Sequence, residues 1–215
     1  MADTQTMIAH QFEDAAQQHE SSMLGMWVFL ATEIMFFGGL FTGYTVYRAA
    51  HPAAFEMASR HLDVVLGAIN TGVLLTSSLT MALAVRCAQT GKRRNVVALL
   101  IVTMLLGVAF LCIKGLEYHQ KYTDHLIPGA SFSFAGPHSR EAEMFFYLYF
   151  AMTGLHAIHM IAGIGVVGVI TILAARGRFT PTYYTPLEVT GLYWHFVDII
   201  WIFLFPLLYL IGPRG

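Results

Sequence analysis

Five apolar segments, each long enough to cross a lipid bilayer, restrict the fold of this chain more than any other feature. They lie at about 23–47, 62–86, 95–116, 143–175 and 187–211. A spanning helix needs about 20 apolar residues, and helices pair every backbone polar group internally where no water is present. Membrane β-strands would show alternation in segments of about ten residues instead. The sequence therefore predicts an all-α, polytopic membrane protein with a bundle of five transmembrane helices.

The composition agrees with a membrane protein. Of 215 residues, 56% are hydrophobic and 12% are charged, whereas a soluble domain carries roughly 25% charged residues. The net charge of −1 argues against nucleic acid as a partner. Residues 1–22 form a polar N-terminal tail without the basic, apolar and small-residue pattern of a cleaved signal. We expect residues 23–215 to form a single five-helix membrane domain.

The distribution of Lys and Arg suggests an orientation. With five spans, the tail and the second and fourth loops share one side of the membrane and carry six basic residues: Arg86, Lys92, Arg93, Arg94, Arg176 and Arg178. The other side carries five: Arg48, Arg60, Lys121, Arg140 and Arg214. The dense GKRR turn at 91–94 lies directly between two spans, where the positive-inside rule acts most strongly. This predicts a cytoplasmic N-terminus and an external C-terminus.

Glu33 is an isolated acid within the first apolar run. No other Asp, Glu, Lys or Arg lies within ten residues on either side. A charged side chain at the bilayer centre costs about 2.5 kcal/mol or more, so such groups face a partner, a lipid head group or a water-filled path. Two interpretations remain open: a hydrogen bond to a neighbouring helix, or a functional carboxyl.

Asp198 is the corresponding membrane-embedded acid of the fifth segment. Trp194, Asp198 and Trp201 fall at i, i+4 and i+7 on one helical face. Either indole N–H, or His195 three residues away, could bond the carboxylate. We expect a structural clamp between helices in preference to a proton-transfer role.

His156 and His159 are three residues apart in the fourth segment, so they share roughly one face. Imidazole is a common metal ligand, but two histidines on one helix cannot bind haem from opposite sides, and further ligands are scattered. The two cysteines, Cys87 and Cys112, have no metal-ligand spacing. We therefore expect hydrogen-bonded or lipid-contacting histidines, and no catalytic, metal or cofactor-binding residue.

Three further patterns concern packing and lipid. Lys114 and Glu117 are spaced for an ion pair, which we expect at the membrane interface. Gly39 and Gly43 form a GxxxG pair, which favours helix packing. Arg176 and Arg178 end the fourth segment beside aromatic residues, and there they either bind a lipid phosphate or extend to the interface without a specific ligand.

Several motifs together resemble one family, subunit III of haem–copper cytochrome oxidases, in its five-span bacterial form. The motifs are ATEIMFFGGLFTGY (31–44), AINTGVLLTSS (68–78), GLEYHQ (115–120), LHAIHMIAG (155–163) and WHFVDIIW (194–201). Glu33 matches the family's membrane-embedded glutamate, which reacts with hydrophobic carbodiimides. Arg176 lies near the position of a lipid-binding arginine, and Lys114 stands where the family has a neutral polar residue. His156, His159, Trp194, His195 and Asp198 match motif positions.

The resemblance implies a non-catalytic, accessory subunit of a proton-pumping cytochrome c oxidase in the bacterial cytoplasmic membrane. Such a subunit has no redox centre of its own, since haem and copper belong to partner subunits that reduce oxygen to water. It packs against oxidase subunit I, binds phospholipid, stabilises the core and supports proton uptake. The alternatives are the equivalent subunit of a quinol oxidase or nitric oxide reductase, an independent transporter using Glu33 and Asp198, or a haem-carrying membrane anchor.

Overall fold

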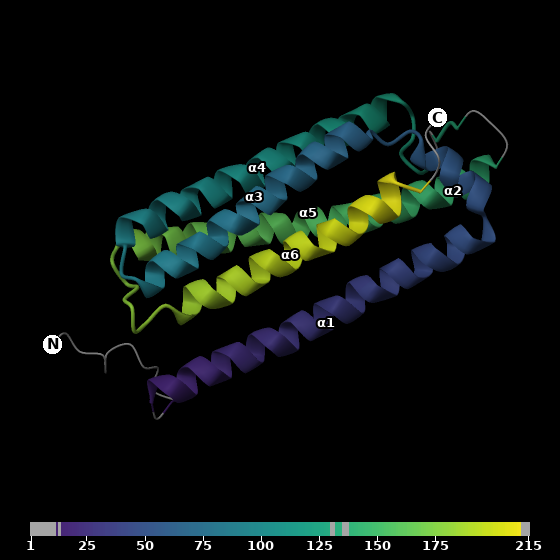
Figure 1. Cartoon of the computed structure of the whole chain (residues 1–215). Helices are drawn as coiled ribbons and strands as arrows, with labels where there is room; N and C mark the ends of the chain where they lie inside the picture. Colours follow the sequence, from purple (N-terminus) through teal and green to yellow (C-terminus); the bar gives the residue numbers. More distant parts are fainter. Residues whose placement is uncertain (1–11, 13, 130–131, 135–137, 212–215) are drawn as a thin grey trace.

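The computed structural model describes residues 12, 14–129, 132–134 and 138–211. Within these ranges it contains helices and no strand. The helices are α1 (Ala15–Ala50), α2 (Pro52–Ser59), α3 (Val64–Gln89), α4 (Arg93–Thr123), α5 (Ser139–Ala175) and α6 (Thr185–Tyr209) (Figure 1). All except α2 are long and apolar enough to cross a membrane. The predicted all-α fold with five spanning helices is confirmed.

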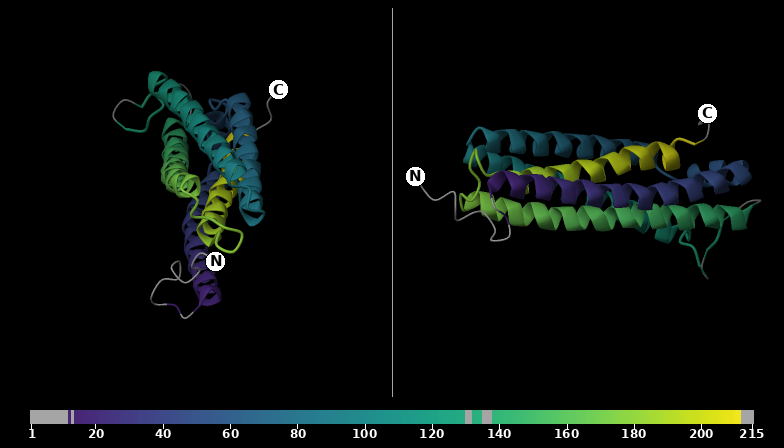
Figure 2. Two further views of the ribbon diagram at one scale, coloured as in Figure 1. Left: turned by 90° about the vertical axis from the view of Figure 1, so that its left-hand side faces the viewer. Right: turned by 90° about the horizontal axis from the view of Figure 1, so that it is seen from below.

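Four of the long helices form a bundle, and the fifth lies along its outside. Each of α3, α4, α5 and α6 packs against two others in the cyclic order α3–α4–α5–α6. Helix α1 packs mainly on α6 and also on α5, so it covers one side of the bundle (Figures 1 and 2). The start of α1, the α3–α4 turn and the α5–α6 connection lie at one end of the molecule (Figure 1). This arrangement matches the alternating topology expected of five spans.

Two helices begin at acidic caps. Asp14 Oδ1 accepts a hydrogen bond from the Gln17 N–H at 2.7 Å, so α1 begins at Ala15 and not near residue 23 as predicted. Asp63 Oδ1 accepts from the N–H groups of Val65 and Leu66 at 2.8 and 3.1 Å at the start of α3. Capping satisfies N–H groups that have no partner within the helix. The polar end of the N-terminal tail therefore continues the first membrane helix.

Helix α2 is an element that the apolar pattern did not predict, because its eight residues are too few to span a bilayer. Proline at its first position favours helix initiation, since the missing N–H would be unpaired there anyway. Phe55 of α2 is buried, and its ring lies 5.4 Å from those of Tyr44 and Phe145. Helix α2 thus closes the end of the bundle between α1 and α5.

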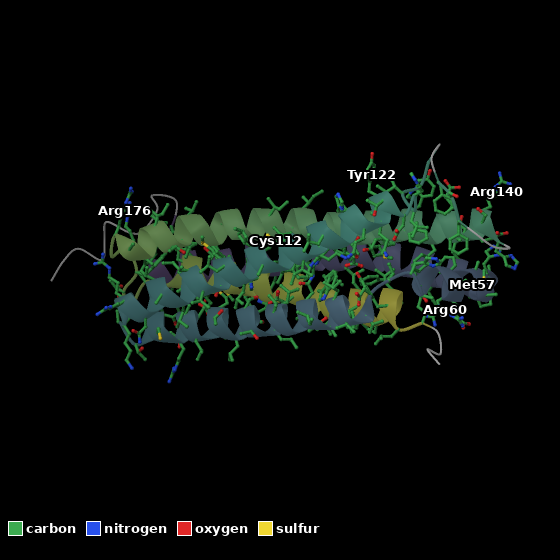
Figure 3. All side chains as sticks on the ribbon, turned by 90° about the horizontal axis from the view of Figure 1, so that it is seen from above. Met57, Arg60, Cys112, Tyr122, Arg140 and Arg176 are labelled. Atoms are coloured by element: carbon green, nitrogen blue, oxygen red, sulfur yellow. The ribbon has the colours of Figure 1, made fainter. Side chains whose placement is uncertain are left out.

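The outer surface of the long helices is apolar, as lipid contact requires. Leu105, Ile158 and Phe203 are among its exposed large side chains. Figure 3 shows Arg176 at one end of the molecule, Arg60 and Arg140 at the other, and Cys112 between them. The charged ends and apolar middle fit a protein embedded across a bilayer.

Close helix packing depends on glycines other than the predicted GxxxG pair. A Cβ at Gly107 would lie 2.9 Å from the Trp194 ring, and one at Gly163 would lie 3.2 Å from it. In contrast, nothing lies within 4 Å of a Cβ built at Gly39 or Gly43. The GxxxG expectation is therefore wrong within this chain, because that face of α1 points away from the bundle.

Candidate functional site: a membrane-embedded acid–imidazole pair

Glu33 and His159 form the one contact between titratable side chains of α1 and α5 that the described residues contain. Glu33 Oε2 lies 3.2 Å from His159 Nε2. The two side chains are 19% and 18% exposed, so the pair lies at the surface of the bundle and not in its core. The structure thus gives Glu33 an imidazole partner that lies 126 residues away in the sequence.

The bonds of His159 determine how many protons the pair holds. His159 Nδ1 lies 2.9 Å from the Leu155 carbonyl oxygen, which can only accept, so Nδ1 carries a proton. The contact between Nε2 and the carboxyl then needs one more proton, either on Glu33 or on Nε2. In both arrangements the pair is electrically neutral and has one proton between its two members. Such a pair can exchange a proton internally without placing net charge in the membrane.

Aromatic groups surround this acid–imidazole pair. The Phe37 ring lies 5.4 Å from the His159 ring in an edge-on arrangement. Tyr193 of α6 donates its hydroxyl hydrogen to the His159 carbonyl oxygen at 3.0 Å, and its ring lies 6.1 Å from that of Phe29. Helices α1, α5 and α6 therefore all contribute to holding the pair in place.

Asp198 lies inside the bundle, but its neighbours differ from those predicted. It is 2% exposed, and neither carboxylate oxygen has a hydrogen-bond partner within the described ranges. The predicted partner His195 is bonded elsewhere, since its Nδ1 lies 2.6 Å from the hydroxyl of Ser78 on α3. The carboxyl of Asp198 therefore makes no hydrogen bond to another helix among the described residues, and the expected clamp through this acid is not seen there.

The two tryptophans of α6 do not bond Asp198. Trp194 donates its indole N–H to the Ser77 hydroxyl at 3.0 Å, and Trp201 donates to the Thr71 hydroxyl at 3.1 Å. The predicted common face is nevertheless real, because all of these partners belong to α3. Small hydroxyl residues of α3, and not the acid, satisfy the indoles.

His156 and His159 have different surroundings despite their spacing. His156 is buried, with its ring 5.4 Å from Phe110 and 5.3 Å from Trp201. Neither of its ring nitrogens is hydrogen-bonded in the part of the chain that the structure describes, which differs from the expected hydrogen-bonded or lipid-facing histidine. Over the same residues, no three His, Cys, Asp or Glu side chains converge as metal ligands would.

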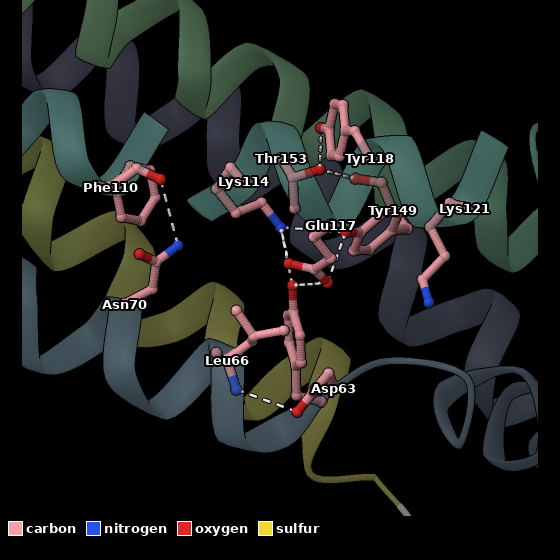
Figure 4. A network of polar contacts seen from close by, with 12 residues as sticks. Asp63, Leu66, Asn70, Phe110, Lys114, Glu117, Tyr118, Lys121, Tyr149 and Thr153 are labelled. Atoms are coloured by element: carbon pink, nitrogen blue, oxygen red, sulfur yellow. Dashed lines mark hydrogen bonds and ion pairs between the residues drawn. The ribbon is translucent and has the colours of Figure 1, made fainter. Parts of the chain in front are cut away.

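A network of polar contacts surrounds Lys114 and Glu117 (Figure 4). The predicted ion pair forms, with Nζ and Oε2 2.9 Å apart. The two residues are 4% and 1% exposed, so the ion pair lies inside the bundle and not on its outer surface. Lys114 Nζ also donates to the hydroxyls of Tyr149 and Tyr209 at 3.1 and 2.9 Å. These hydroxyls donate in turn to Glu117 Oε1 at 2.9 and 2.6 Å.

The network satisfies all the hydrogen-bond donors of the Lys114 ammonium group. An ammonium has three donors, and each of them has an acceptor here. The rings of Tyr118, Tyr149, Trp201 and Tyr209 lie 5.1–5.5 Å from Nζ and add cation–π attraction. Only the i, i+3 spacing could be recognised in the sequence, since the two tyrosines that bond the ion pair, Tyr149 and Tyr209, come from α5 and α6. The network joins α4, α5 and α6 and is a structural element with no sequence signature of its own.

Two surface features bear on lipid. An apolar groove of about 460 Å³ runs between α1 and α6, and Trp27, Phe37, Phe41, His195 and Phe203 are among its lining residues. Arg176 and Arg178, the predicted phosphate ligands, are exposed at the end of α5. The structure places them apart from this groove's lining.

Known proteins resemble this chain over nearly its full length. Residues 7–213 match the family described as cytochrome c oxidase subunit III. Cytochrome c oxidase subunit 3 of Alkalihalophilus pseudofirmus is 32% identical over 94% of the chain and 93% of the relative. Quinol oxidase subunit 3 of Bacillus spizizenii is 33% identical over 90% of the chain and 89% of the relative. Cytochrome bo(3) ubiquinol oxidase subunit 3 of Pseudomonas putida is 30% identical over 90% of the chain and 87% of the relative.

Proposed function

Because this chain belongs to the cytochrome c oxidase subunit III family, we propose that it is the accessory subunit III of a proton-pumping cytochrome c oxidase. In this role it binds no redox cofactor itself. It packs against subunit I, which with the other core subunits carries haem and copper and reduces oxygen to water. The single observation that carries the proposal is the match to subunit III relatives over all five membrane helices.

The proposed support of proton uptake rests on the acid–imidazole pair. Glu33 and His159 share one proton, are partly exposed, and leave the membrane free of net charge in either arrangement. A proton can pass between the two members without a change in net charge. A net gain or loss of one proton charges the pair by one unit, and this charge then requires a compensating group on a core subunit beside the partly exposed pair. The fully enclosed Lys114–Glu117 network is less suited to exchange, because every donor of its cation is occupied.

The proposed stabilisation of the core and the binding of phospholipid rest on the outer surface. The α1–α6 groove has a volume of about 460 Å³ and a mainly apolar lining, which suits an acyl chain. The open face of α1 around Gly39 and Gly43 allows another helix or a lipid to approach its backbone closely. We place the protein in a bacterial cytoplasmic membrane with its N-terminus in the cytoplasm, on the side of the GKRR turn.

A quinol oxidase is the second candidate complex, because relatives named as quinol oxidase subunits are as similar as those named as cytochrome c oxidase subunits. The TEIMFF and YWHFVDIIW motifs favour the cytochrome c enzyme by resemblance. The electron donor belongs to the core subunits, so the fold of this chain is compatible with both.

Purification from the native membrane tests the proposal. A tagged copy of the chain, extracted in mild detergent, should bring with it haem- and copper-containing subunits and an oxygen-reducing activity. Oxidation of reduced cytochrome c supports the first candidate, and oxidation of ubiquinol supports the second. A chain that purifies alone and transports an ion, or one that holds stoichiometric iron or copper when isolated, contradicts both.

A further inference from the structure

A second groove, distinct from the one beside α1, lies between α4 and α5 at the GKRR end of the molecule. It has a volume of about 590 Å³ and is lined by Arg93, Arg94, Val97, Ala98, Ile101 and Ala175. Two guanidinium groups therefore stand at its mouth, and no acidic residue lines it. Its remaining walls are apolar.

The spacing along α4 gives the groove an amphipathic profile. Arg94, Val97, Ala98 and Ile101 follow one another at i, i+3, i+4 and i+7, so they lie on one face of the helix. The positive charge of Arg94 is thus followed by apolar side chains one to two helical turns closer to the membrane centre. Among them, Ile101 is well exposed. A phospholipid has the same order of groups, with its phosphate above its acyl chains.

Arg93 makes the mouth of the groove rigid. Its Nε donates to the Ala174 carbonyl oxygen at 3.1 Å, and its Nη2 donates to the carbonyl of Ala175. These bonds satisfy carbonyl groups at the end of α5, which have no partner within the helix. Gly177 permits the approach, because it adopts a φ of 77° and a Cβ there would lie 2.8 Å from Arg93 Nη1. The guanidinium is held in place and keeps its positive charge.

The guanidinium of Arg94, unlike that of Arg93, is available to bind a ligand. It is exposed, and none of the ion pairs or hydrogen bonds among the described residues includes it. Lys92 on the same turn is also exposed and adds to the positive potential. A planar guanidinium binds phosphate oxygens bidentately, so the free group has the geometry for an anionic ligand.

We propose that the α4–α5 groove binds one anionic phospholipid, with its phosphate between Arg93 and Arg94 and an acyl chain along Val97, Ala98 and Ile101. The charge complementarity of the mouth selects this occupant over a zwitterionic lipid or an apolar partner helix. The inference rests on the proposed lipid-binding role and gives it a specific site. That site is neither the α1–α6 groove nor the exposed guanidiniums of Arg176 and Arg178.

A site-specific crosslink in the intact oxidase tests this. A photo-crosslinking amino acid replaces Ile101, and the purified complex is reconstituted in vesicles of equal parts phosphatidylglycerol and phosphatidylcholine. We expect the crosslink to yield predominantly phosphatidylglycerol adducts, identified by mass spectrometry. Arg94→Gln should lower this preference about fivefold, the effect of one basic residue near an anionic membrane surface.

Two matched variants make the test specific. Arg86→Gln removes an exposed charge at the same end on α3, outside the groove, and should leave the preference unchanged. Ala98→Phe should reduce adducts of both lipids, because its ring fills the apolar part of the groove. Equal labelling of the two lipids, the same loss in Arg86→Gln, or a crosslink to a protein subunit overturns the proposal. Co-purification with the core subunits reports the accessory role separately in every variant.

Discussion

Glu33 Oε2 and His159 Nε2 lie 3.2 Å apart on neighbouring helices, and the bond of Nδ1 to the Leu155 carbonyl restricts the pair to a single shared proton. The pair is therefore neutral whether the proton resides on the carboxyl or on the imidazole. This explains how an acid can lie within an apolar run without an accompanying cation in the sequence. The two arrangements make different predictions for substitution.

Glu33→Gln should assemble into the oxidase at normal yield. A glutamine amide N–H can donate to a neutral Nε2 as a protonated carboxyl does, and its shape is similar. The yield and thermal midpoint of the purified complex measure this, with Glu33→Leu as the variant that cannot bond. If the glutamine variant fails to assemble as the leucine variant does, the pair exists as a carboxylate and an imidazolium, and the charge itself is structural.

A hydrophobic carbodiimide should modify Glu33 and leave Asp198 unmodified. Glu33 is 19% exposed at the surface of the bundle, whereas Asp198 is 2% exposed within it. Mass spectrometry of the labelled chain identifies the modified residue, and Glu33→Gln should abolish the label. Labelling at Asp198 under conditions that keep the complex folded would show a path into the bundle that the static packing lacks.

Lys114→Met should destabilise the protein by about 3–5 kcal/mol, the usual cost of removing one member of a buried ion pair. The substitution leaves the Glu117 carboxylate buried with two tyrosine hydroxyls but no cation. Thermal unfolding of the purified complex measures the loss.

The double variant Lys114→Met/Glu117→Gln is the control for this network. It removes the unpaired charge while keeping a group that can bond the tyrosines, so we expect it to recover much of the lost stability. A double variant as unstable as Lys114→Met alone would mean that the side chain of Lys114 acts through packing against its four aromatic rings and not through its charge.

Gly107→Ala should destabilise the bundle by about 1–3 kcal/mol, because the added methyl group would overpack the Trp194 ring. Gly39→Ala has open space around it and should be neutral or slightly stabilising in the isolated chain. The two variants should be compared by thermal unfolding, alone and in the oxidase. If Gly39→Ala impairs only the assembled complex, a partner helix packs on that face of α1.

Deletion of the whole chain should leave an oxidase that still reduces oxygen but loses activity faster during turnover. The reason is that the redox centres belong to the proposed core subunits, which this bundle stabilises from outside. Oxygen consumption followed over successive turnovers measures the lifetime, and restoring the chain is the control. Loss of haem from an otherwise assembled core would contradict the accessory role.

The sequence by itself determined the five membrane helices, the isolation of Glu33 in the first of them, and the pairing of Lys114 with Glu117. All three depend on composition or on spacing within one helix, which the 3.6-residue period sets locally. The resemblance of five motifs also identified the family before any tertiary contact was known.

Only the tertiary structure decided which groups these side chains meet. His159 lies 126 residues from Glu33, and Tyr209 lies 95 residues from Lys114. Such partners depend on how the helices are rotated and crossed, and packing of side chains along their whole length sets that geometry. For the same reason the glycines that allow close approach are Gly107 and Gly163 and not the GxxxG pair: a helix sequence specifies its faces, but the neighbouring helices determine which face is covered.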